Sequence, residues 1–232
     1  MKAIFQREFK SYFTSVTGYA FAAFLLLFVG IYTMSICLVG YYPNYEYVPG
    51  NTAFIFLLIV PIVTMKTFAE ERKQKTDLLL YALPIGMKKI VMGKYLALLA
   101  VFAVPMLPTA IYPFILKMYG NVSLKVVFTA LTGFVLLGAA LLAFGMFVSS
   151  LTESQPLAAG ISFLFILLNF LSGSLATYLP TGSELISSLS LFDRLDNFVY
   201  GILDMGDIVF YISAAALFVF LTVQSLEKRR WS

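Results

Sequence analysis

The sequence predicts an all-α polytopic membrane protein with six transmembrane helices. Hydrophobic side chains make up 60% of the 232 residues and charged ones only 12%, proportions that exclude a water-soluble fold. Six runs without a charge each reach about the 20 residues that cross the hydrocarbon core. These runs are 11–45, 47–65, 95–116, 126–152, 154–183 and 208–226. Six spans leave no loop long enough for a soluble catalytic domain, so any ATPase must be another chain.

The basic residues predict the orientation of the spans. Of the 16 Lys and Arg residues, only Lys117, Lys125 and Arg194 lie outside if the N-terminus is cytoplasmic. Lys and Arg near span ends favour the cytoplasmic side, so we expect both termini there. The same charges favour contact with anionic lipid, and we expect no nucleic-acid partner.

The residue types that are missing limit the chemistry. The chain has no His and a single Cys, Cys37. This excludes a Ser/His nucleophile, a His-ligated zinc, a His proton relay and an intrachain disulfide. The carboxylates cluster at span ends, where anchoring of the spans explains them, so a membrane enzyme is not expected. We therefore expect no catalytic residue, metal or cofactor in this chain.

The N-terminal segment 1–16 predicts an amphipathic elbow helix in the membrane interface. Apolar residues such as Phe5 and Phe9 fall on one helical face, and Arg7 and Lys10 fall largely on the other. The apolar face would lie at the headgroup boundary while the bases meet anionic lipid. The alternative is a frayed basic tail.

The first two spans are predicted over 18–40 and 52–68, after a turn at Thr17 and Gly18. The outer connection between the spans contains four tyrosines, which are typical of an interfacial aromatic belt. Pro61 removes a backbone donor in the second span and is expected to kink it as a packing device.

The third and fourth spans, 95–116 and 126–150, differ in the residues that shape them. The third contains Pro105, Pro108 and Pro113, so we expect a kink in its outer half. The fourth is rich in Gly and Ala, which let neighbouring helices approach closely.

The fifth and sixth spans are predicted over 157–180 and 207–225. Asn169 stands in apolar company and is expected to form a hydrogen bond between helices. The connecting segment 183–206 is too apolar for a solvated loop and too charged for a complete span. It predicts one or two short helices that re-enter the membrane from the outside.

The inner loop 70–90 is polar at both ends and apolar between them. Thr76 is placed to cap a short helix that ends near Leu83, Asp77 suits the helix dipole, and Pro84 follows the end. Such a helix would present leucines to a partner protein. Alternatively, the leucines lie on the bilayer or pack under the bundle.

The stretch GMKKIVMGK in the same loop resembles a phosphate-binding loop only superficially. Six residues separate its two glycines, and Tyr95 replaces the Ser or Thr that would bind magnesium. Lys88, Lys89 and Lys94 are instead expected to mark the membrane entrance of the third span.

Four stretches resemble the type-2 ABC transporter permeases, especially the subgroup associated with gliding-motility transporters. They are REFKSYFTSVTGYAF, FAEERKQKTDLLLYALPIGMKKIVMGKYLA, SSLTESQPLAA and LSLFDRLDNFVYGILDMGDIVFY. They are similar, in this order, to the family's interfacial elbow, coupling-helix loop, second inner turn and outer re-entrant region. The similarity spreads over nearly the whole chain, so residues 1–232 are expected to form a single permease domain.

The resemblance implies a noncatalytic subunit in a bacterial plasma (inner) membrane. The subunit would pair with a second permease copy or a paralogue and dock on ATP-binding cassette subunits, which would hold ATP and Mg. The ATPase-coupling residues that the resemblance implies are Glu70, Glu71, Thr76, Asp77, Leu78, Leu79, Leu80 and Pro84. The elbow residues are Phe5, Arg7, Glu8, Phe9 and Lys10. Asp77 stands where the family leads us to expect Glu, which keeps the charge and shortens its reach.

The expected function is export of an amphipathic or lipid-like cargo. The resemblance implies that spans one, two and five line the route, and span cores without charges disfavour a small ion as cargo. Two alternatives are an ion-coupled secondary carrier and a non-transporting scaffold or immunity protein. A carrier should show ionisable residues inside its spans or an inverted repeat, and we detect neither. A scaffold would stay active when its ATPase partner cannot hydrolyse ATP.

Overall fold

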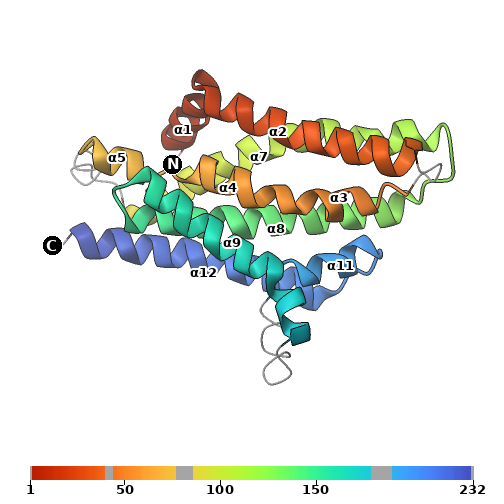
Figure 1. Ribbon diagram of the computed structural model, residues 1–232. Helices are drawn as coiled ribbons and strands as arrows, with labels where there is room; N and C mark the ends of the chain where they lie inside the picture. The colour runs from red at the N-terminus through yellow and green to blue at the C-terminus, as the bar shows by residue number, and fades with distance from the viewer. Residues whose placement is uncertain (1, 40–43, 77–85, 179–189, 231–232) are drawn as a thin grey trace.

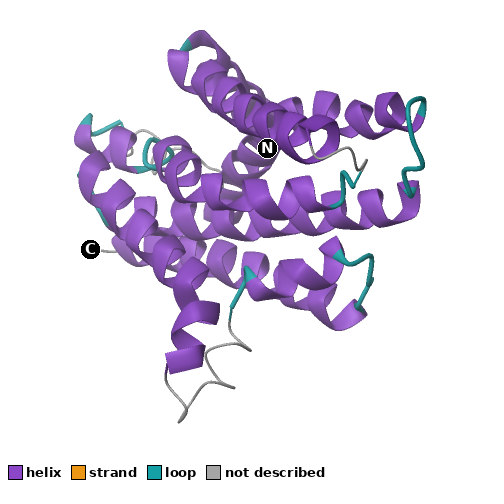
Figure 2. Ribbon diagram, turned by 45° about the vertical axis from the view of Figure 1, so that its right-hand side comes forward, coloured by secondary structure: helices purple, strands orange, loops and turns teal. Residues whose placement is uncertain are grey.

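The computed structural model is a bundle of long helices (Figures 1 and 2), and it describes residues 2–39, 44–76, 86–178 and 190–230. Every regular element in these ranges is helical. Six helices or helical runs are long and apolar enough to cross a membrane, which confirms the predicted fold class. They cover Val16–Val39, Tyr47–Lys73, Met87–Lys117, Leu124–Leu151, Gln155–Gly173 and Met205–Arg229.

The individual helices are shorter than the spans at the start of the chain. The first span joins α2 to a π-helical segment, Met34–Val39, and the second joins α3, a 3₁₀ turn, Ala53–Ile55, α4 and α5. The helices are α1 (Lys2–Thr14), α2 (Val16–Thr33), α3 (Tyr47–Thr52), α4 (Phe56–Thr64), α5 (Ala69–Lys73), α7 (Met87–Lys117), α8 (Leu124–Leu151), α9 (Gln155–Tyr178), α11 (Asp193–Val199) and α12 (Met205–Arg230). Pro61 does not interrupt α4, and the irregular turns lie on either side of that helix.

The bundle has two ends with different contents. We call the end that holds α1, α5 and the last turns of α12 the basal end, and the end that holds α3 and α11 the distal end (Figure 1). Arg229 pairs with Glu153 at 3.2 Å at the basal end, which joins the end of α12 to the α8–α9 connection. Both ends of the described chain therefore lie at the basal end, as six crossings require.

Helix α8 lies at the centre of the packing because its small residues admit side chains from its neighbours. An added Cβ at Gly138 would lie 2.6 Å from the Phe102 ring of α7, and one at Gly145 would collide with Thr64 of α4. Near the distal end, Gly133 is covered in the same way by Phe198 of α11. The small residues of the fourth span therefore permit close helix approach, as the sequence indicates.

Helix α7 continues without interruption through Pro105, Pro108 and Pro113. Pro113 has no N–H for the carbonyl of Thr109, four residues earlier, and an unpaired carbonyl is costly inside a bilayer. The hydroxyl of Tyr45, a fully buried residue before α3, donates to that carbonyl at 3.0 Å. A distant tyrosine thus satisfies the backbone group that the proline frees.

Helices α1 and α2 meet at a sharp corner. The break falls at Ser15, which is extended (φ −97°, ψ 160°), and not at the expected Thr17 and Gly18. The Ser15 hydroxyl donates to the Tyr12 carbonyl at 3.2 Å, which satisfies a group at the end of α1. An added Cβ at Gly18 would lie 2.6 Å from the same carbonyl oxygen, so glycine is needed for the close approach and not for the turn.

A short helix, α11, occupies the described part of the predicted re-entrant segment, residues 190–206, and 183–189 lie outside the described residues. Asn169 of α9 accepts a hydrogen bond from the Leu191 N–H at 2.9 Å, so its bond joins a helix to the connecting segment. Arg194 pairs with the buried Asp207 at the start of α12 at 2.5 Å. Tyr211 donates to the Leu191 carbonyl at 2.6 Å. These contacts fix α11 against the bundle.

Candidate functional site

Three helices that are distant in sequence meet around one buried ammonium group at the basal end. The Lys94 side chain in α7 is 1% exposed, and its Nζ lies 2.9 Å from Glu71 Oε1 in α5 and 3.3 Å from Glu8 Oε1 in α1. We call Arg7, Glu8, Glu71 and Lys94 the basal ion cluster. It connects the N-terminal helix to both helices that flank the predicted first inner loop.

Arg7 completes the cluster from the water side. Its Nη2 lies 2.6 Å from Glu8 Oε1 and 2.9 Å from Glu71 Oε1, so each carboxylate has two cationic partners. The hydrogen bond with Glu8 and the charges of both carboxylates raise the pKa of Arg7 above its usual value, against a smaller opposing effect of burial. Arg7 therefore stays charged, and two cations balance two anions within the cluster.

The backbone turn between α4 and α5 supplies further partners. Lys94 Nζ donates to the Thr67 carbonyl at 2.7 Å and lies 4.8 Å from the centre of the Phe68 ring. Tyr12 of α1 donates to the Val63 carbonyl at 3.1 Å, and burial raises the pKa of its hydroxyl, so it remains a neutral donor. Both side chains satisfy carbonyls where the helical pattern is broken.

Helix α5 is held at its start and ends at a defined residue. Ser149 of α8 accepts hydrogen bonds from the N–H groups of Phe68 and Ala69, each at 3.1 Å, and so caps α5 from another helix. At the other end, the N–H of Thr76 bonds to the Glu71 carbonyl at 2.9 Å, and Lys75 has a left-handed φ of 55°. This is a Schellman ending with lysine where glycine is preferred, and it fixes the backbone at the end of α5.

The structure brings together three of the predicted site residues. Arg7 and Glu8 from the elbow set and Glu71 from the coupling set meet in the basal ion cluster. Glu70 lies beside them in α5 but takes no part in the cluster, and the Thr76 hydroxyl donates to the Glu71 carbonyl at 3.2 Å. The remaining coupling residues, Asp77, Leu78, Leu79, Leu80 and Pro84, lie outside the described residues.

The other elbow residues lie along α1 without joining the cluster. The rings of Phe5 and Phe9 stack with centroids 6.0 Å apart, and Phe9 packs in turn on Phe13 at 5.0 Å. Lys10 is exposed on another part of the helix. Lys2–Thr14 is therefore a regular helix and not a frayed tail, and its place in the membrane interface stays a prediction.

Lys94 has partners that sequence reasoning missed. The sequence indicates an anchor at the membrane entrance of the third span, and the structure buries the side chain between α1, α5 and α7 as the partner of two carboxylates. Lys88 and Lys89 of the same group are exposed. One signal was present in the sequence: Glu8 in the predicted elbow helix and Glu71 just after the second predicted span are carboxylates expected on the same side of the membrane as Lys94.

The basal ion cluster provides charge pairing and mechanical connection. Each charged group already has ion-pair partners, so the cluster joins α1, α5 and α7 and offers no unpaired acid or base. Among the described residues, no group of three or more His, Cys, Asp or Glu side chains is arranged to hold a metal ion. The arrangement therefore suits transmission of movement between helices.

The comparisons with known proteins agree with a transport role. The family model described as ABC-2 family transporter protein matches residues 2–229, which is nearly the whole chain. A search of curated proteins found no match. The matched range includes all six candidate spans and all four residues of the basal ion cluster. The chain therefore belongs to the ABC-2 transporter family, as a multi-pass, noncatalytic membrane permease.

Proposed function

We propose that this permease couples ATP hydrolysis on separate ATP-binding cassette subunits, with their ATP and Mg, to cargo movement through its first inner loop. The basal ion cluster carries the proposal, because Glu71 lies at the start of the loop 70–90 and Lys94 lies shortly after its end. Displacement of the loop has to move α5 and α7 together or break the ion pairs. Since Arg7 and Glu8 share those pairs, α1 would move as well.

The coupling contact itself is proposed for the loop residues. Leu78, Leu79 and Leu80 would insert into the ATPase, Asp77 and Glu70 would contact its polar rim, and Thr76 and Pro84 would bound the docking helix. An ATPase that docks differently in its ATP-bound and free states would bias the permease between two packings. The ion pairs would carry that bias into the bundle.

A second permease copy or a paralogue is proposed to pack on the face formed by α2, α4 and α9. In the most apolar stretch of each span, the buried share of the residues is 17% in the first span and 22% in the fifth. The corresponding share in the second span is 67%. In α4, Leu58 and Ile62 are nevertheless exposed. A route between two such apolar faces would suit an amphipathic or lipid-like cargo moving outward. Membership of the gliding-motility subgroup is part of the same proposal.

The basal end is proposed to lie in the cytoplasm of a bacterial cell, with the spans in its plasma membrane. Arg7 and Lys94 lie there together with the exposed Lys88, Lys89 and Lys228, whereas the distal end has few basic residues. Enrichment of Lys and Arg at one end of a bundle favours the cytoplasmic side for that end. An ATPase in the cytoplasm could then reach the loop.

Purification of the chain in nanodiscs with its stoichiometric partners tests the proposal. We expect an ATP-binding subunit to co-purify, and Leu79→Asp to abolish the complex or the stimulation of its ATPase by the permease. Leu151→Asp is the matched control, because Leu151 is 53% exposed at the basal end outside this loop. A chain that purifies alone and transports without ATP would contradict the proposal in favour of a secondary carrier. A permease that stays fully active when its ATPase partner cannot hydrolyse ATP would favour a non-transporting scaffold.

A further inference from the structure

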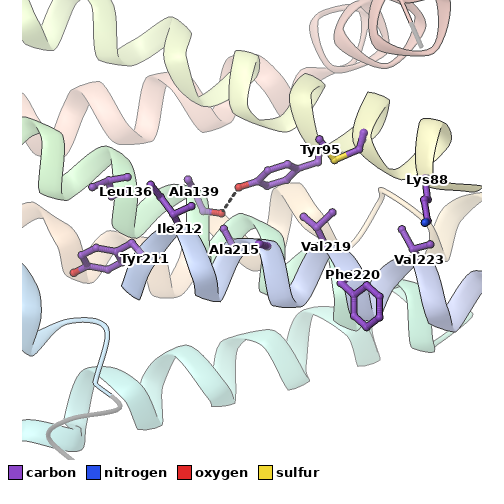
Figure 3. Close-up of a pocket in the computed structure, with 12 residues that line it drawn as sticks. Lys88, Tyr95, Leu136, Ala139, Tyr211, Ile212, Ala215, Val219, Phe220 and Val223 are labelled. Atoms are coloured by element: carbon purple, nitrogen blue, oxygen red, sulfur yellow. Dashed lines mark hydrogen bonds between the residues drawn. The ribbon is translucent and has the colours of Figure 1, made fainter. Parts of the chain in front are cut away.

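An open apolar groove of 470 Å³ lies between α7 and α12, with α8 as its floor (Figure 3). Its volume is within the range of pockets that hold small molecules. Met92 comes from α7, Leu136 and Ala139 from α8, and Ala215 and Val219 from α12. The groove is formed by other helices than α2, α4 and α9, so it is separate from the proposed cargo route.

The polar groups of the groove wall already have partners. Tyr95 donates to the Ala139 carbonyl at 3.1 Å, the hydrogen bond drawn in Figure 3. Tyr211 donates to the Leu191 carbonyl at 2.6 Å, away from the groove. An occupant therefore meets hydrocarbon along the wall and has no hydrogen bond to make there.

The groove is about as long as one leaflet of a bilayer is deep. Its lining on α12 runs from Tyr211 to Val223, which corresponds to a helical rise of about 18 Å. The hydrocarbon core of a membrane is about 30 Å thick, so one leaflet contributes about half of that depth. An extended acyl chain that enters at the basal end and reaches past the middle of α12 matches this length.

Among the described residues that line the groove, Lys88 alone is charged, and it stands at the basal mouth. Lys88 is exposed, and Figure 3 shows it beside Val223 at the end opposite Tyr211. No ion pair with a carboxylate of the described residues is formed by Lys88. An ammonium at the membrane boundary above an apolar slot is complementary to a phosphate attached to an acyl chain.

We propose that this groove is a binding site for one anionic phospholipid, with an acyl chain between α7 and α12 and its phosphate on Lys88. The lipid stays bound to the lateral surface of the permease and is not the cargo. It fills the space between α7, which carries Lys94 of the basal ion cluster, and α12, so its presence would stiffen the two helices against each other.

Native mass spectrometry of the full chain in mild detergent, titrated with dioleoyl phosphatidylglycerol or dioleoyl phosphatidylcholine, tests the proposal. We expect one lipid per chain and about fivefold tighter binding of the anionic lipid, the effect of one Lys near anionic lipid. Lys88→Gln should erase this preference, and Lys89→Gln, its exposed neighbour, should keep it. Ala215→Phe fills the groove and should weaken the binding of both lipids at least tenfold, because the acyl chain is excluded.

Ala103→Phe is the matched control for the filled groove, since Ala103 is exposed on α7 and does not line it. If Ala215→Phe and the wild type have the same Tm without added lipid, the variant is folded. Equal binding of both lipids with no effect of Lys88→Gln would overturn the anionic site. Normal binding by Ala215→Phe would overturn the groove as its location. A lipid-free dimer that Ala215→Phe dissociates would assign the groove to a second copy and overturn the proposal.

Discussion

Replacement of Lys94 by methionine tests whether the basal ion cluster holds the permease together. Lys94→Met keeps an unbranched side chain of similar length in the buried site and removes the ammonium group, with its charge and its N–H donors. Glu8 and Glu71 would then face each other with Arg7 as their one shared cation, and the Thr67 carbonyl would lose its donor. We expect a large loss of stability.

The magnitude follows from the geometry of the cluster. Glu8 Oε1 and Glu71 Oε1 lie 2.6 and 2.9 Å from the same Arg7 nitrogen, so they are at most about 5.5 Å apart. At an effective dielectric constant of about 20 they repel each other by about 3 kcal/mol or more, part of which Arg7 offsets. Leaving a buried carbonyl without its donor costs about 1–3 kcal/mol. The sum agrees with the roughly 3–5 kcal/mol found when one partner of a buried ion pair is removed. For a chain of this size, this lowers the Tm by about 10 °C.

Thermal unfolding in detergent of the single and double variants measures the effect. Glu71→Gln removes one of the opposed charges, so the double variant with Lys94→Met should be more stable than the sum of the single losses indicates, by about 1–3 kcal/mol. Lys89→Met is the control, because Lys89 is exposed on the same helix, and its effect should be below about 0.5 kcal/mol.

Two results would refute this reasoning. The first is an effect of Lys94→Met no larger than that of Lys89→Met, because a buried and paired ammonium cannot be that weakly coupled. The second is additivity of Lys94→Met and Glu71→Gln within about 0.5 kcal/mol, because residues in direct contact should not behave as independent sites.

Three further predictions concern other parts of the chain. Tyr45→Phe leaves the Thr109 carbonyl in α7 unpaired and should destabilise by about 1–3 kcal/mol in the same unfolding assay; an unchanged Tm would refute the role of that hydrogen bond. Lys75→Gly relieves a left-handed φ of 55° and should stabilise by about 1 kcal/mol, whereas a loss would show that the lysine side chain matters more. In a background without the native cysteine, a membrane-impermeant thiol reagent should label Tyr119→Cys on intact spheroplasts and Lys89→Cys only after lysis; the reverse pattern would invert the proposed orientation.

The number and place of the membrane helices could be predicted because they depend on sums over single residues. Hydropathy over about 20 residues and the placement of charges at span ends predicted six crossings, and the structure has six helical runs of that kind. The Gly and Ala content of the fourth span indicated close packing in the same additive way, and Phe102 and Phe198 do fill the space above its glycines.

The sequence by itself determined that this chain is a helical membrane protein, and its motifs indicated the transporter family. Only the tertiary structure decided how the polar groups are paired. Lys94 pairs with Glu8 and Glu71, and Tyr45 donates to the Thr109 carbonyl that Pro113 frees. In the pairs Lys94–Glu8 and Tyr45–Thr109 the partners are 64 or more positions apart in the sequence. Such pairs depend on which helices lie side by side, whereas hydropathy depends on each residue alone. In a bilayer, where water does not satisfy buried polar groups, these pairings hold the irregular parts of the fold in place.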